Sequence, residues 1–129
     1  MIPYGFTKEI DKPIEQVVSL VTEALKKEGF GVLTTIDVKE KLKEKIGVNF
    51  KKYLILGACS PKHAHQALLA EENIGLMLPC NVVVYEKDSK TVLSVVRPTA
   101  MMSMLENERL AGIAKTVESL LKKVFDSVI

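Results

Sequence analysis

The chain has 129 residues, of which 47% are hydrophobic and 26% charged, and its formal net charge is +2. A chain of this size is typical of one domain, so we expect residues 1–129 to fold around a single core. The composition excludes wholesale disorder, and the near balance of charge argues against nucleic acid or an acidic membrane surface as a partner.

Strands and helices alternate in the first half of the predicted structure. Residues 4–10 predict a short strand, and residues 14–25 carry apolar side chains at helical spacing. The β-branched residues within 32–37 predict a second strand. A capping-box pair, Asp37 and Glu40, then opens a second helix with one apolar stripe.

The middle of the chain predicts a buried strand, a helix and a hairpin. The continuous apolar run of residues 53–58 is typical of a strand inside a sheet. Ser60 and Pro61 predict the N-cap and first turn of the helix that follows. Residues 81–86 and 91–97 predict two strands joined by a tight turn.

Two helices complete the predicted structure, a short one through residues 101–105 and a long amphipathic one over 110–125. Without the short helix, the element order is β-α-β-α-β-α-β-β-α. The hairpin requires at least one antiparallel pair. We predict the α+β class, with a single-layer mixed, mostly antiparallel sheet and helices packed on it.

The sequence predicts a cytoplasmic protein. No run of about 18 apolar residues indicates a membrane span, and residues 1–11 lack the basic and apolar regions of a signal peptide. In the cytoplasm Cys59 and Cys80 are expected to remain thiols. Frequent Lys and scarce Trp, Gln and Asn fit a thermophilic source.

The chemically richest segment is Cys-Ser-Pro-Lys-His-Ala-His, residues 59–65, with Cys80 fifteen residues after it. Cys59 lies where a buried strand meets a helix N-terminus, whose dipole and free N–H groups favour a lowered thiol pKa. Two strand ends can bring Cys59 and Cys80 together. The pair would then be a redox couple, a soft-metal site or a nucleophile with a supporting thiol. The simpler interpretation is two small buried hydrophobic residues.

A metal site is one possibility that this segment leaves open. His63 and His65 lie about 200° apart around a helix, so at most one of them completes a set with the cysteines. The candidate ligands are Cys59, His65 and Cys80. Their spacing lacks the paired C-x-x-C knuckles typical of zinc.

Three methionines, Met101, Met102 and Met104, are compatible with Cu(I) but are more typical of core or interface filling. No dinucleotide-binding, P-loop or nucleophile-elbow motif occurs, which argues against Rossmann and ordinary hydrolase functions. The sequence therefore leaves any cofactor unknown.

Several blocks resemble a family of small bacterial and archaeal proteins called domain of unknown function 302. They include GFGVLT, ILGAC, LPCNVVVYE and MMS. The resemblance implies a small α/β domain, often a homodimer, with no established biochemical role. Thr35 stands where the family commonly has an acidic residue, and Ser60 where it commonly has Asn. The family motif falls here on Cys59, Pro61, His65, Pro79, Cys80 and Asn81.

Three kinds of function are compatible with these observations. One is a dimeric binding module that holds a small-molecule ligand or a soft metal, without turnover, at Cys59, Pro61, His65, Cys80 and Asn81. Another is a thiol enzyme or redox protein, with Cys59 as the attacking thiolate and Cys80 as the resolving thiol. The last is a pure assembly protein whose apolar surface comes from residues 101–105 and the last helix.

Overall fold

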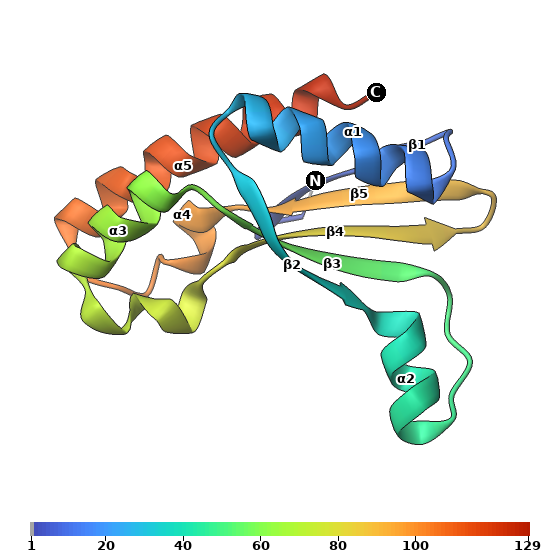
Figure 1. Ribbon diagram of the computed structural model, residues 1–129. Coiled ribbons are helices and arrows are strands. Elements are labelled where there is room, and N and C mark those ends of the chain that lie inside the picture. Colours follow the sequence, from blue (N-terminus) through green and yellow to red (C-terminus); the bar gives the residue numbers. More distant parts are fainter. Residues whose placement is uncertain (1) are drawn as a thin grey trace.

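The computed structural model describes residues 2–129 (Figure 1). In chain order the elements are β1 (Gly5–Ile10), α1 (Ile14–Lys27), β2 (Gly31–Asp37), α2 (Val38–Ile46), β3 (Tyr53–Cys59), α3 (Pro61–Ala70), the 3-10 helix η1 (Glu72–Met77), β4 (Cys80–Lys87), β5 (Lys90–Val96), α4 (Pro98–Met101) and α5 (Glu108–Ser127).

This order confirms the predicted α+β class and adds η1 between α3 and β4. The helix predicted over residues 101–105 is wrong: α4 spans Pro98–Met101 and a turn follows it, because proline's fixed φ suits the first turn of a helix. The predicted capping box is confirmed, since the Asp37 side chain accepts a hydrogen bond from the Glu40 N–H at 3.0 Å. Within the described part of the chain, no helix is long and apolar enough to cross a membrane.

The strands form one five-stranded sheet in the order β1-β5-β4-β3-β2. All pairings between neighbouring strands of the described chain are antiparallel. The sequence predicts a mixed, mostly antiparallel sheet, and no parallel pair is found among these strands. Strand β1 lies at one edge of the sheet and pairs with β5. The first and last strands in the sequence are therefore neighbours. Strand β3 lies inside the sheet, as its continuous apolar run predicts.

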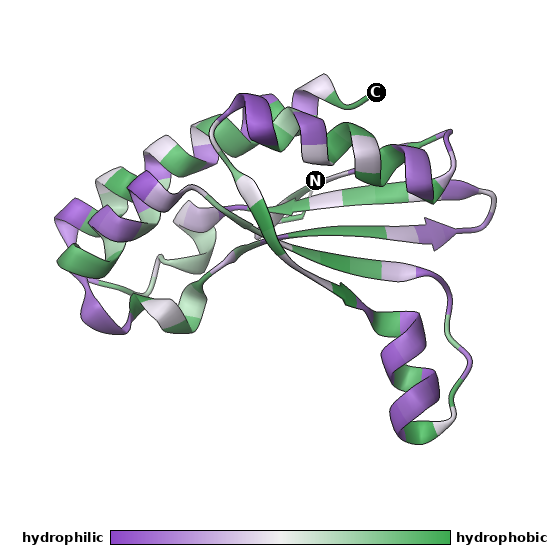
Figure 2. Ribbon diagram, viewed as in Figure 1, coloured by the Kyte–Doolittle hydropathy of each residue, from purple (hydrophilic) through white to green (hydrophobic). Residues whose placement is uncertain are grey.

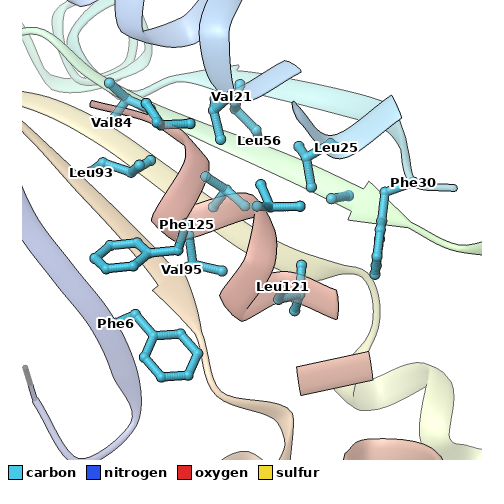
Figure 3. Close-up of a cluster of buried hydrophobic side chains, with 14 of the residues drawn as sticks. Phe6, Val21, Leu25, Phe30, Leu56, Val84, Leu93, Val95, Leu121 and Phe125 are labelled. Atoms are coloured by element: carbon cyan, nitrogen blue, oxygen red, sulfur yellow. The ribbon is translucent and has the colours of Figure 1, made fainter. Parts of the chain in front are cut away.

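Helices α1 and α5 cover one face of the sheet and form the core with it (Figure 1). Figure 3 shows the side chains of both helices meeting those of the strands. Leu25 of α1 and Leu121 of α5 are fully buried, as are Leu56, Val84 and Leu93 of the sheet. The 3.6-residue spacing of apolar residues in the helices and the period of two in the strands put these residues on facing surfaces.

The opposite side of the sheet carries no helix along its length, and we call it the open face. Its side chains alternate along the strands with the buried ones, and its apolar members include Ile36, Tyr53, Ile55, Val83 and Tyr85. Helix α2 extends from the sheet on this side (Figure 1) and buries none of its own residues. Figure 2 shows hydrophobic bands on α2 among hydrophilic ones.

Replacing Leu121 by Ala should destabilise the protein by about 2–5 kcal/mol, since it removes a fully buried side chain and leaves a cavity. Urea unfolding followed by circular dichroism measures this change. The control is Leu76→Ala, because Leu76 is 90% exposed, and the free energy of unfolding should then move by less than about 0.5 kcal/mol. Equal effects of the two substitutions would contradict the packing of α5 described here.

Candidate functional site

The structure brings the two cysteine residues to one cavity. Strand β3 ends at Cys59 and β4 begins at Cys80, and the antiparallel register pairs Ala58 with Cys80. Neither cysteine is in a disulfide, and both residues line a cavity of about 30 Å³, which we call the Cys59/Cys80 cavity. Cys59 is half-buried, whereas Cys80 is buried.

The walls of this cavity are almost entirely apolar. They come from β3, α3, α4, α5 and the segments that join them, and include Phe30, Pro98, Leu110 and Val117. No carboxylate, lysine or arginine side chain lies in the lining. A ligand that binds here would lose its contacts with water and gain contacts with hydrocarbon and sulfur groups.

A polar pair, Ser60 and His63, lies at the N-terminal end of α3, and both residues line the cavity. Ser60 occupies the predicted N-cap, but its side chain makes no capping bond to the helix backbone. Its Oγ lies 2.7 Å from Nδ1 of His63 instead. When Nδ1–H donates to Ser60, the Nε2 lone pair of His63 is left free to bind a ligand.

The remaining predicted site residues lie elsewhere. Pro61 and His65 are exposed on α3 and are not part of the cavity lining. Asn81 is exposed on the open face, because successive residues of a strand point to opposite sides and Cys80 points inward. The predicted ligand set Cys59, His65 and Cys80 is not assembled, and residues 2–129 contain no group of three His, Cys, Asp or Glu placed to hold a metal.

The pKa values of both thiols move in the direction opposite to that expected from the helix N-terminus. Burial raises the pKa of Cys59. Burial, and then the nearby charge of Cys59, raise the pKa of Cys80 to about 11. Burial removes water from the thiolate, which disfavours the charged form of each cysteine. Both side chains are therefore protonated at neutral pH.

A close contact between neighbouring strands fixes the position of Cys80. A Cβ atom at Gly57 would lie 2.6 Å from Cγ2 of Thr34 and 2.8 Å from Cγ of Pro79. Only glycine allows this approach without a shift of its neighbours. Pro79, which also lines the cavity, is thereby held against β3 immediately before Cys80.

Two lining residues, His63 and Met102, were not assigned to this site from the sequence. The spacing of Ser60 and His63, which matches that of a capping box, is the signal that could have identified His63. Met102 follows α4, which is held against α5 because Glu118 accepts hydrogen bonds from Oγ1 and N of Thr99, at 2.6 and 3.0 Å. No local sequence pattern predicts this contact between Thr99 and Glu118, which lie far apart in the sequence.

Comparison with known proteins gives two findings. The family described as "Domain of unknown function DUF302" matches residues 6–128. The crystal structure of an uncharacterized conserved DUF302 protein from Bacillus stearothermophilus is similar at a TM-score of 0.91 and 32% sequence identity, over 98% of each chain. No curated protein matches the chain.

The raised pKa of Cys80 predicts that alkaline pH destabilises the wild type more than a Cys80→Ala variant. Between pH 9.0 and about 11 the unfolded thiol has lost its proton while the folded one retains it. The unfolded state then binds fewer protons, so the free energy of unfolding falls as pH rises. The thiol should account for about 2 kcal/mol of loss between about pH 8 and 10.5.

Urea unfolding of both proteins at the two pH values measures this difference. Parallel pH dependences in wild type and Cys80→Ala would contradict the burial of Cys80.

Proposed function

The chain belongs to the DUF302 family, and we propose that it is a binding module that holds a small ligand or a soft metal ion in the Cys59/Cys80 cavity without turnover. The observation that carries this proposal is that two cysteine residues from different strands line one apolar cavity. Sulfur next to hydrocarbon suits a ligand that is itself polarizable and weakly hydrated.

Binding is favoured over thiol chemistry by the state of the two cysteines. A thiol nucleophile acts as the thiolate, which a lowered pKa supplies. The pKa values of Cys59 and Cys80 are both raised. The cavity lining contains no carboxylate or lysine, and its histidine, His63, is paired through Nδ1 with Ser60 at 2.7 Å. We propose a cytoplasmic location, where a reducing environment keeps both thiols available.

Native mass spectrometry tests the binding function. Protein is incubated under reducing conditions with soft metal ions, and separately with small organic molecules, and should carry one adduct per chain with at least one of these probes. Cys80→Ala should lose the adduct, because it removes a sulfur atom from the cavity. Asn81→Ala is the control, since Asn81 is exposed on the open face, and it should keep the adduct. A wild type that stays free of every probe would count against the proposal.

We also propose that two copies of the chain associate through the open face. Apolar side chains gather on this side: Ile36 is 44% exposed, Ile46 of α2 is 67% exposed and Phe50 is 39% exposed. Tyr53 and Tyr85 stack here with ring centroids 5.0 Å apart. Monomers rarely leave apolar patches above about 300–600 Å² uncovered. The apolar side of α5, expected to serve assembly, is instead buried in the chain's own core.

A second copy of the chain fits this surface because each chain has both surfaces of the contact, an exposed apolar helix and an uncovered sheet face. Helix α2 has an apolar side with no residue buried, and the open face lacks a helix. Under two-fold symmetry each α2 packs on the partner's open face, and the contact is made twice. A stable interface buries roughly 800 Å² per partner, and the exposed parts of Phe50, Ile36 and Ile46 contribute to it.

Light scattering coupled to size-exclusion chromatography tests this assembly. The wild type should elute with twice the 14.3 kDa chain mass at micromolar concentration. Ile46→Asp should give a monomer, because it places a charge in the apolar contact. Leu76→Asp changes a residue that is 90% exposed on η1, and this variant should remain dimeric. A monomeric wild type would refute the dimer.

A further inference from the structure

The Cys59/Cys80 cavity is far too small for an ordinary organic ligand. Its volume is about 30 Å³, which is enough for about one or two water molecules. Pockets for drug-sized molecules span roughly 300–1,000 Å³. A single ion fits the space without displacement of α3 or α5 from the sheet.

Most of the residues around the cavity that carry a donor atom carry a soft one. Cys59, Cys80 and Met102 belong to its lining and supply sulfur, and His63 adds one imidazole. Thiolate and thioether sulfur select Cu(I), whereas Mg²⁺ and Ca²⁺ require oxygen ligands. The chemistry of the lining therefore points to a monovalent, sulfur-seeking ion.

The number of ligands separates Cu(I) from zinc. Structural zinc sites use four Cys or His ligands. In residues 2–129 no three His, Cys, Asp or Glu side chains are grouped around one point, so the cavity offers too few of the ligands that zinc prefers. A thioether such as that of Met102 adds to a Cu(I) site but is not among the usual zinc ligands.

We propose that the cavity holds one Cu(I) ion between the sulfur atoms of Cys59, Cys80 and Met102, an inference that rests on the binding function proposed above. On binding, the S–H bonds of the two cysteines break, two Cu–S bonds form and both protons pass to solvent. The ion remains Cu(I), so no electron donor or acceptor is needed. The complex carries one negative charge, and the half-buried position of Cys59 leaves it in contact with water.

Anaerobic competition for Cu(I), supplied as its acetonitrile complex, against the chromophoric chelator bathocuproine disulfonate tests the proposal. The wild type should bind one Cu(I) per chain. Cys59→Ser and Cys80→Ser should abolish competition with the chelator. Met102→Leu keeps the size and apolarity of the side chain but removes its sulfur, and should weaken binding by about 10–100-fold.

Met104→Leu is the matched control, because Met104 is 74% exposed and lies outside the cavity lining. Its Cu(I) affinity should equal that of the wild type. Equal urea midpoints for the two methionine variants would show that both fold. If Met102→Leu binds Cu(I) as tightly as Met104→Leu, the three-sulfur site is overturned.

The same measurements separate this inference from the function on which it rests. If the chain takes up no Cu(I) but retains another ligand in native mass spectrometry, the Cu(I) assignment fails and the binding function stands. If the chain takes up neither Cu(I) nor any other probe, both fail.

Discussion

The packing of α1 and α5 on one face of the antiparallel sheet is the interaction on which the rest of the structure depends. It buries side chains of β1, β3, β4 and β5, from Phe6 to Val95, and fixes the sheet relative to α5. The strand ends that carry Cys59 and Cys80 then lie against α3 and α5. Because α5 contributes both to the core and to one wall of the cavity, the close packing of the core also holds that wall in place.

Local sequence patterns predict much of this fold. The β-branched runs locate the strands, and the Asp37 and Glu40 pair locates the start of α2. The cysteines flank two strands that are consecutive along the chain, so an antiparallel pairing of β3 and β4 was enough to bring them together. Strand order is not local, because the pairing of β1 with β5 depends on contacts between the two ends of the chain.

The features that the sequence did not predict all depend on long-range packing or on solvent. Met102 reaches the cavity only because Glu118 holds Thr99 against α5. The pKa of Cys59 rises because burial removes water from the thiolate. Helix α2 has the apolar stripe of a packed helix, yet none of its residues is fully buried in its own chain, which local periodicity cannot reveal.

The central claim is that the two sulfur atoms border the same small space. A small trivalent methylarsenical tests it most directly, because one arsenic atom forms two bonds to sulfur only when both thiols are within reach of it. Mass spectrometry of the reduced, folded wild type should show a single arsenic per chain with neither thiol left to react with maleimide. Two arsenicals on one chain, or two thiols that stay free, would contradict the account.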